Sequence, residues 1–232
     1  MTQLRGLPCW SSCLPLKVAD CPPADALLGK LDRSQPVRNA QLVVLSEHVD
    51  YWNDIGWKDP YSSHEFSVRQ GDYSHRFRLD GPYTPQMVVD GETQFVGSDE
   101  RRAIETIEGA AKAAKVPVRL SSVHLEGSAV AAGVESGTLA SPGSSAKVLV
   151  ALADDSDQTI VTRGENAGRT LTHVAVVRTL TQVGTIDPGG VFSKNVKVSA
   201  ENANTRNLRV VAIVQEMATG RILGVGSARL SN

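Results

Sequence analysis

The first half of the chain mixes hydrophobic and polar residues in both helical and strand periods. Pro22 and Pro23 suit the first turn of a helix, and the apolar residues after them recur at helical spacing. Ser63 and Ser98 are predicted to cap two later helices. The elements expected over residues 22–115 are a helix after Pro22, a strand over 41–49, a helix over 62–79, a hairpin over 86–96 and a helix over 98–115. This order predicts an α/β layer.

The second half of the chain has a different pattern. From Val116 onward β-rich runs recur, separated by clusters of Gly, Ser, Asp and Asn, and no helical stretch lies between them. The strands expected are 118–125, 146–152, 158–163, 171–180, 194–199, 208–215 and 222–228. Strands at this spacing predict a β-sandwich or barrel. We therefore expect two domains, over residues 1–115 and 116–232.

Composition and charge narrow the classes of protein to consider. The chain has 232 residues, with 24 basic and 25 acidic side chains and a formal net charge of -1. A nucleic-acid-binding protein normally carries a basic excess, so nucleic acid is not an expected partner. No apolar run is long enough to span a membrane as a helix, and residues 1–16 lack the apolar core of a secretory signal. Without a signal, the chain as written is expected in the cytoplasm.

The three cysteines, Cys9, Cys13 and Cys21, all lie near the N-terminus. An odd number in a chain of this length does not indicate a disulfide framework. Cys21 directly precedes the predicted helix, where the positive end of the helix dipole would lower the pKa of a thiol and favour the thiolate. The alternative, equally weighted, is a half-buried cysteine that remains from a lost active site.

Polar and aromatic residues gather after the predicted strand 41–49. His48 and Asp50 are two positions apart, so their side chains should face the same side, and loops at the carboxyl ends of strands form ligand crevices. His48 is a candidate base for a thiol or half of a metal pair, but a histidine that hydrogen-bonds Asp50 and fixes the loop is the favoured interpretation. No recognisable metal motif occurs, and neither a metal nor a cofactor is expected. The residues expected to line one pocket are His48, Asp50, Tyr51, Trp52, Trp57, Asp59 and Thr84.

Several short motifs stand out along the chain. They are Asp20-Cys21-Pro22-Pro23-Ala24-Asp25, residues 48–52, 55–60 and 83–91, and in the second half Arg163-Gly164-Glu165-Asn166, Gly168-Arg169, His173 and residues 176–178. Together they resemble one known family, a bacterial and plant family of thioredoxin-like, usually exported proteins of undefined function. The resemblance implies a thioredoxin-like fold for the first half, with a cis proline at Pro85, after Thr84, that packs against the active-site cysteines. It also implies export to an oxidising compartment.

The chain departs from this family at its N-terminus. The family opens with a strand and a Cys-x-x-Cys before Pro-Pro, whereas here Val18 stands at the position of the first cysteine and the opening strand is expected to be missing or disrupted. Residues 10–19, back-translated and read one base earlier, can give a peptide similar to that missing part. We hypothesise a frameshift or a wrongly assigned start upstream of Cys21, which the coding DNA would test.

Two functions of different classes follow from these observations. The first is a thioredoxin-like protein related to thiol–disulfide oxidoreductases, with Cys21, Thr84 and Pro85 at its centre and a protein or peptide thiol or disulfide as substrate. The second is a non-enzymatic module that binds a protein or peptide. A hydrolase using His48 and Asp50 lacks an identifiable nucleophile. The polar motif of the second half, which includes His173, is expected to form an ion-paired turn or a contact with the first domain.

Overall fold

The computed structural model describes residues 3–10, 21–38, 40–53, 58–139, 143–162 and 168–230. Within these residues the chain forms three helices, α1 (Cys21–Ser34), α2 (His64–Arg76) and α3 (Glu100–Ala110). The strands of the first half are β1 (Gln3–Trp10), β2 (Ala40–Ser46), β3 (Gln86–Val89) and β4 (Thr93–Val96). Those of the second half are β5 (Val118–Glu126), β6 (Ala129–Ser136), β7 (Ala146–Ile160), β8 (Thr170–Ile186), β9 (Ser193–Ser199), β10 (Leu208–Glu216) and β11 (Ile222–Arg229).

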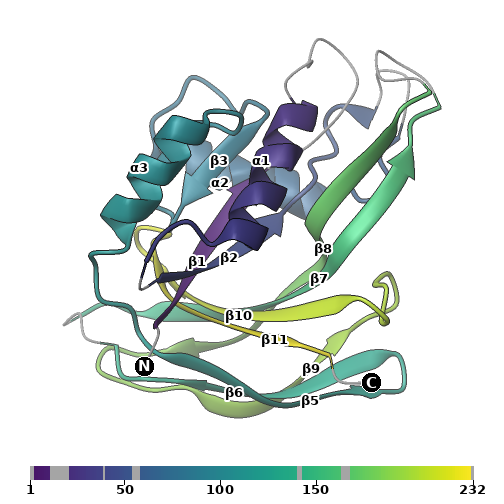
Figure 1. The fold of residues 1–232 in the computed structure, drawn as a ribbon. Helices are drawn as coiled ribbons and strands as arrows, with labels where there is room; N and C mark the ends of the chain where they lie inside the picture. The colour runs from purple at the N-terminus through teal and green to yellow at the C-terminus, as the bar shows by residue number, and fades with distance from the viewer. Residues whose placement is uncertain are drawn as a thin grey trace.

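One large sheet runs through both halves of the chain (Figure 1). Its strand order is β11-β10-β7-β8-β2-β1-β3-β4, and a smaller sheet has the order β5-β6-β9. The two halves meet where β2 and β8 pair in parallel, with Ser46 opposite Val176. β1 pairs in parallel with β2 and antiparallel with β3, so it lies inside the sheet.

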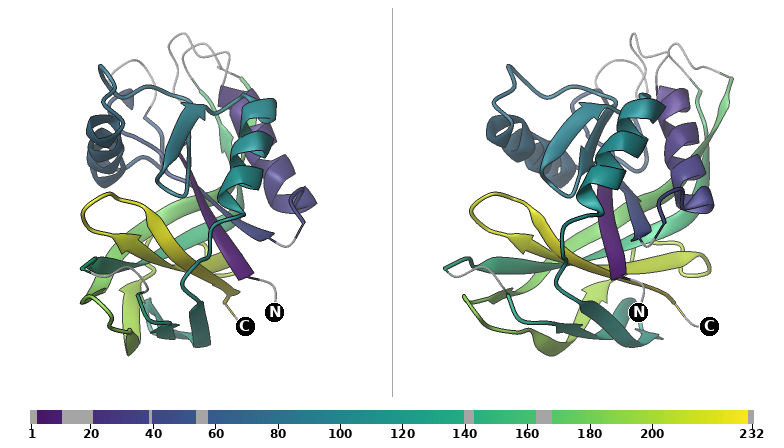
Figure 2. Two further views of the ribbon diagram at one scale, coloured as in Figure 1. Left: turned by 90° about the vertical axis from the view of Figure 1, so that its left-hand side faces the viewer. Right: turned by 60° about the vertical axis from the view of Figure 1, so that its left-hand side comes forward.

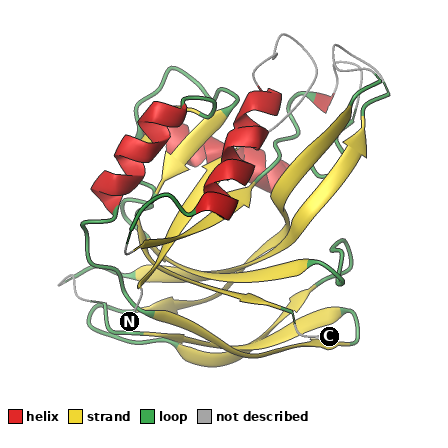
Figure 3. Cartoon of the chain, viewed as in Figure 1, coloured by secondary structure: helices red, strands yellow, loops and turns green. Residues whose placement is uncertain are grey.

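The predicted fold class, a thioredoxin-like domain followed by a sandwich-like domain, is wrong. The described chain is mostly β, with three helices and eleven strands, and its large sheet curves toward a barrel (Figure 3). Periodicity predicted most of the strands but not their pairing, and β7, β8, β10 and β11 continue the sheet that contains the strands of the first half. The opening strand expected to be missing or disrupted is present as β1. A domain division at residue 115 stays a prediction.

Three hydrophobic cores hold the layers together. α1 and α3 cover one face of the sheet at β2 and β3, α2 covers the other face, and a third core fills the space between the large and the small sheet (Figure 2). Alternation along β2 assigns its side chains to two of these cores. Leu42 and Val44 pack on the α1 side, and Val43 and Leu45 on the α2 side.

Local signals in the sequence explain where the helices and the hairpin begin. The Ser63 hydroxyl accepts a hydrogen bond from the Glu65 amide at 3.3 Å and caps α2, as predicted. α3 is capped by Asp99 rather than Ser98, because the Asp99 carboxylate accepts from the Arg102 amide at 2.9 Å. The predicted hairpin forms as β3 and β4, which pair antiparallel.

Candidate functional site

His48 lies two residues beyond the end of β2 and continues its alternation. It is fully buried and faces the same side of the sheet as Val44, the side covered by α1. The loop that follows returns at residues 58–61 and brings Asp59 against the imidazole. His48 Nδ1 and Asp59 Oδ2 are 2.6 Å apart, and both side chains are buried. His48 and Asp59 thus form a short, buried ion pair.

The pair changes the acidity of both its members. Burial alone would lower the pKa of His48, but the carboxylates of Asp59 and Asp25 more than offset this and raise the pKa above its usual value. Burial alone would raise the pKa of Asp59, but the imidazole of His48 lowers it overall. The charged forms of His48 and Asp59 therefore support each other in the interior.

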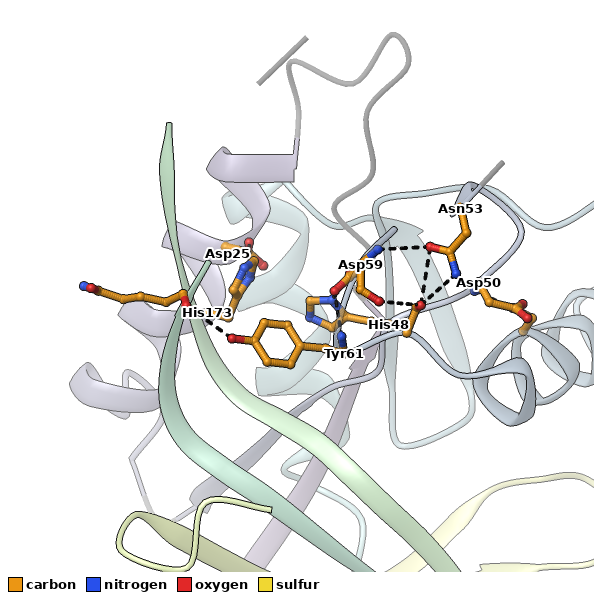
Figure 4. A network of polar contacts seen from close by, with 10 residues as sticks. Asp25, His48, Asp50, Asn53, Asp59, Tyr61 and His173 are labelled. Atoms are coloured by element: carbon orange, nitrogen blue, oxygen red, sulfur yellow. Dashed lines mark hydrogen bonds and ion pairs between the residues drawn. The ribbon is translucent and has the colours of Figure 1, made fainter. Parts of the chain in front are cut away.

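A second buried histidine–aspartate pair stands beside the first (Figure 4). His173 comes from β8 and Asp25 from the second turn of α1. His173 Nδ1 and Asp25 Oδ2 are 3.1 Å apart, and both side chains are nearly inaccessible. The pair thus joins the first helix to a strand of the second half, 148 positions along the chain.

Three rings bring the two pairs together. The His48 and His173 rings have centroids 5.1 Å apart at an interplanar angle of 77°, and the Tyr61 ring lies 5.6 Å from each in an edge-on arrangement. The Arg178 guanidinium lies 4.8 Å from the Tyr61 centroid. We call the side chains of Asp25, His48, Asp59, Tyr61 and His173 the histidine cluster.

One buried ring nitrogen of the histidine cluster makes no hydrogen bond to the described residues. His48 Nε2 is buried, and it has no hydrogen-bond partner among the described residues. Most buried polar atoms have a partner, so an unpartnered one at a cluster of titratable groups marks a candidate functional position. In the described part of the chain no three His, Cys, Asp or Glu residues are arranged to hold a metal ion.

The predicted hydrogen bond between His48 and Asp50 is wrong. Asp50 lies half-buried on the other side of the loop, where its Oδ1 accepts from the Ser67 hydroxyl and its Oδ2 lies 3.3 Å from His64 Nδ1. Asn53 instead braces the loop, because its Oδ1 accepts from the Asp59 amide at 3.1 Å (Figure 4). The aspartate of this loop that contacts His48 is therefore Asp59 and not Asp50.

Tyr51, Trp52 and Thr84 lie together, away from the two histidines. The Trp52 indole donates to the Thr84 hydroxyl at 3.2 Å, and the Tyr51 ring lies 5.3 Å from that of Trp52. The Tyr51 hydroxyl donates to Gln70 on α2 at 2.9 Å. The Thr84–Pro85 peptide bond is cis, the isomer that the family resemblance implied.

The start of α1 lies beside Pro85. Cys21 is the first residue of the helix, and Ala24 lies within its first turn. A β-carbon added to Gly97 would meet the Pro85 β-carbon at 3.2 Å and the Ala24 β-carbon at 3.5 Å, so both pack around the same point. The structure therefore brings the helix start and the proline together. Trp57, Cys13, Val18, Arg163, Glu165 and Asn166 lie outside the described residues.

A groove of about 290 Å³ runs between α1 and β8 and reaches the histidine cluster at Asp25. Gly29 lets the helix approach the strand, since a β-carbon there would meet Val174 at 3.1 Å. The lining residues are Pro22, Asp25, Ala26, Gly29, Arg33, Thr170, Leu171, Thr172 and Val174. The groove begins at Pro22, next to Cys21, so it connects the helix start with solvent.

Sequence reasoning missed Asp25 and His173 as members of the site. Both occur in motifs quoted for the family resemblance, and His173 was expected at an ion-paired turn or a contact between the two halves. Asp25 on α1 and His173 on β8 lie 148 positions apart, and α1 comes to lie against β8 because β8 pairs in parallel with β2. Their adjacency is a property of the sheet order, which periodicity does not predict.

Comparison with known proteins identifies the family. A family model described as a protein of unknown function, DUF1223, matches residues 18–215. The chain belongs to the DUF1223 family. A similar fold is seen in the crystal structure of a protein from Agrobacterium tumefaciens, determined by a structural genomics consortium. It matches with a TM-score of 0.71 and 26% identity, over 98% of this chain and 94% of that one.

Other similarities to this DUF1223 protein are weak. Spo0M, a sporulation control protein of Bacillus subtilis, matches at 15% identity with a TM-score of 0.33 over 51% of this chain and 48% of that one. Red sea bream transglutaminase matches at 15% identity with a TM-score of 0.29 over 59% and 19%. No curated protein matches the chain. Of the helices in the described residues, none combines the length and apolar character that a membrane crossing requires.

Proposed function

We propose that this DUF1223 protein carries out thiol–disulfide exchange at Cys21, on a small or peptide disulfide. One observation carries the proposal: α1 begins at Cys21, its first turn packs with Pro85 around Gly97, and the groove between α1 and β8 begins at the next residue, Pro22. Position 21 is thus the first residue of a helix, the position at which the helix dipole favours a thiolate.

The chemistry needs a thiolate at neutral pH. The unpaired amide groups and the dipole of a helix N-terminus lower the pKa of a thiol and favour its ionised form. The Cys21 thiolate would attack one sulfur of a disulfide, form a mixed disulfide with that half and release the other half as a thiol. A second thiol would then attack the mixed disulfide and regenerate Cys21.

The second thiol has to come from outside the described site. Val18 stands at the position of the first cysteine in the family motif and cannot attack or resolve a disulfide. We therefore propose a one-thiol exchange that uses a small thiol of the glutathione class as co-reactant. With a disulfide-bonded protein such as insulin and no added thiol, turnover should be negligible, and Cys21→Ser should change it little.

The test measures mixed-disulfide formation on the full chain with oxidised glutathione. Trypsin separates the cysteines, because the peptide of residues 18–30 holds Cys21 alone and that of residues 6–17 holds both Cys9 and Cys13. Mass spectrometry then gives the rate for each peptide. At pH 7 we expect the Cys21 peptide to react roughly tenfold faster than the other, and faster than in denaturing urea.

Two results would count against the exchange function. Equal rates for the two peptides would mean that Cys21 has no activated thiol. A Cys21 rate that is unchanged in denaturing urea would mean that the fold contributes nothing. Cys21→Ser supplies the control for label on the 18–30 peptide.

The second candidate, a binding module without chemistry, is supported by the same groove. An extended peptide could lie between α1 and β8 whether or not Cys21 reacts. Binding of a peptide library that survives Cys21→Ser and is lost on Arg33→Ala, which lines the groove, would favour this function over exchange. Binding lost on Cys21→Ser alone would favour exchange.

A further inference from the structure

We propose that the groove between α2 and the strands β7 and β8 binds a small aliphatic carboxylic acid, with its carboxylate at Arg69 and Lys147 and its chain on the apolar part of the groove. We call this the α2 groove. It lies on the face of the large sheet that α2 covers, so the inference goes beyond the exchange function and does not depend on Cys21. Its volume of about 350 Å³ is at the lower end of the range for small-molecule pockets, which suits a small acid rather than a peptide. The lining residues are His64, Glu65, Phe66, Val68, Arg69, Asp72, Lys147, Leu149, Leu180 and Gln182.

Arg69 is held at the wall of the α2 groove by buried groups. Its Nη1 donates to the Gln215 side chain at 2.9 Å, and its guanidinium lies 5.5 Å from the centroid of the Tyr73 ring. Gln215 is itself fixed, because its amide nitrogen donates at 2.6 Å both to the Tyr73 hydroxyl and to the Gly220 carbonyl. The guanidinium is therefore preorganised, and a ligand that meets it does not have to order it.

Lys147 on β7 supplies the second cation of the α2 groove. Its side chain is half-buried and makes no hydrogen bond or ion pair within the described residues. Burial and the positive charges of Arg69 and Arg76 lower the pKa of Lys147, and Asp72 only partly opposes them. A carboxylate bound beside Lys147 would offset this repulsion between like charges.

The acidic residues of the α2 groove do not cancel this positive charge. Glu65 and Asp72 are both exposed, so water and salt screen them more than they screen the half-buried Lys147. The lowered pKa of Lys147 shows that the arginines outweigh Asp72 at that position. The charge around Lys147 is thus complementary to an anion.

The strand register separates a charged end of the α2 groove from an apolar end. Along β7, Lys147 and Leu149 line the groove, and Ala151 follows them on the same face. Leu180 of β8 is paired with Ala151. Lys147 therefore lies at one end and Leu180 at the other, with Leu149 between them.

The helix follows the same order. The charge of Lys147 interacts with Asp72 and Arg76 in the second half of α2, whereas Phe66 and Val68 belong to its first half. The apolar side chains of helix and strands thus gather away from Lys147. Val68 is 52% exposed, and an aliphatic chain laid on it would remove apolar surface from water. A ligand with one carboxylate and one short chain matches both ends.

The experiment measures binding of octanoate to the full chain at pH 7 by isothermal titration calorimetry. Octanamide is the matched probe, because it keeps the chain and lacks the charge. We expect a Kd of about 0.1–1 mM for octanoate and binding at least about tenfold weaker for octanamide, since the charged contacts are lost. Equal affinities would overturn the proposal, because the chain alone would then account for binding.

Two substitutions test the two ends of the α2 groove. Lys147→Met keeps a long side chain without its charge and should weaken octanoate binding about tenfold while leaving octanamide binding unchanged. Val68→Asp places a negative charge at an exposed position of the groove and should also weaken octanoate binding. Lys112→Met and Val191→Asp, at exposed positions outside the groove, are the controls and should bind octanoate as the wild type does. Wild-type affinity in Lys147→Met, or an equal loss for octanamide, would overturn the site.

Glu47 adds a pH signature that reports contact of the ligand with Arg69. It is fully buried, its Oε2 lies 3.4 Å from Arg69 Nε, and burial raises its pKa to about 7. Ionised Glu47 would repel a carboxylate bound at Arg69, so octanoate affinity should fall about three- to tenfold as pH rises from 6 to 8. Glu47→Gln should remove most of this fall.

The other ionisable groups near Glu47 are few among the described residues. The charges that act on it are those of Arg69 and Glu65, both on α2, and Tyr73 stays neutral near pH 7 because burial raises its pKa. His64, which lines the α2 groove, is tested separately by His64→Gln, which should keep the fall in affinity. A fall that persists in Glu47→Gln and vanishes in His64→Gln would overturn the contact with Arg69.

The source of the carboxylate is tested with N-acetyl-leucine, which stands for the carboxyl end of a peptide. We expect it to bind more weakly than octanoate, because its short branched side chain cannot reach from the charged end of the α2 groove to Leu180. Tighter binding of N-acetyl-leucine than of octanoate would overturn the assignment to a free aliphatic acid.

Discussion

Glu47 and His48 are consecutive residues, both fully buried, and they face opposite sides of the sheet. His48 points to the α1 side, where Asp59 lies 2.6 Å away. Glu47 points to the α2 side, where the nearest cation is Arg69, with Nε at 3.4 Å from Glu47 Oε2. Two ionisable side chains on one strand end thus have similar burial but different partners.

The partner of each buried side chain determines whether its ionised form is stable in the interior. Glu47 has no hydrogen bond to either carboxylate oxygen among the described residues, and its burial raises its pKa to about 7 because Arg69 only partly offsets the loss of water. The charged form of His48 is favoured because Asp59 is in contact and raises the pKa of the imidazole. The comparison teaches that contact distance and hydrogen bonding, rather than burial, separate a stable buried charge from a costly one.

The largest effect should follow from breaking the close pair. Asp59→Asn leaves the His48 charge without its partner and should cost about 3–5 kcal/mol of unfolding free energy near pH 6. The pKa of His48 is raised in the folded state, so the contribution of the pair is present below the unfolded pKa of about 6.5 and is lost as pH rises through the folded value. Urea titrations at several pH values measure both the cost and its decrease at high pH.

The matched control is Asp50→Asn, the aspartate that local spacing selected as the partner of His48. Asp50 is half-buried and pairs with Ser67 and His64, so its loss should cost less than about 1 kcal/mol. A larger cost for Asp50→Asn than for Asp59→Asn would restore the sequence-based pairing and contradict the comparison.

On the other face of the sheet, a substitution that removes the ionisable group should stabilise the protein instead of destabilising it. The folded pKa of Glu47, about 7, exceeds its ordinary 4.5, so the folded state holds a proton that the unfolded chain releases between these values. Stability from this group therefore falls as pH rises from about 4.5 to 7. Glu47→Gln removes the ionisation and should stabilise the protein by about 3 kcal/mol at pH 8, with little change at pH 4.

Glu108→Gln is the control for this substitution, since Glu108 is exposed on α3 and its change should move the urea midpoint little at either pH. A Glu47→Gln variant that is less stable than the wild type at pH 8 would mean that Arg69 satisfies Glu47 fully. The two buried residues would then not differ in the way argued above.

The sequence predicted most of the helices and strands, but it did not predict which of them pair or pack together. The β-branched and aliphatic residues of 41–49 predicted β2, and proline and capping residues predicted where α1 and α2 begin. The partner of His48 was assigned by nearness in the chain, although the loop carries Asp59 inward and Asp50 outward. The pair of Asp25 with His173 depends on β8 joining β2, and no local pattern encodes a pairing between strands so far apart.

The smallest effect concerns what holds the two histidines together. Tyr61 touches both imidazoles with its ring, while its hydroxyl makes a long 3.3 Å bond to the Gln158 carbonyl at an exposed position. If the ring is the contributing part, Tyr61→Phe should change the unfolding free energy by less than about 0.5 kcal/mol, whereas Tyr61→Leu should cost about 1–2 kcal/mol through lost aromatic contacts. Calorimetry on the two variants measures the difference. Equal costs would show that the hydroxyl dominates, and the cluster would then be organised by hydrogen bonds alone.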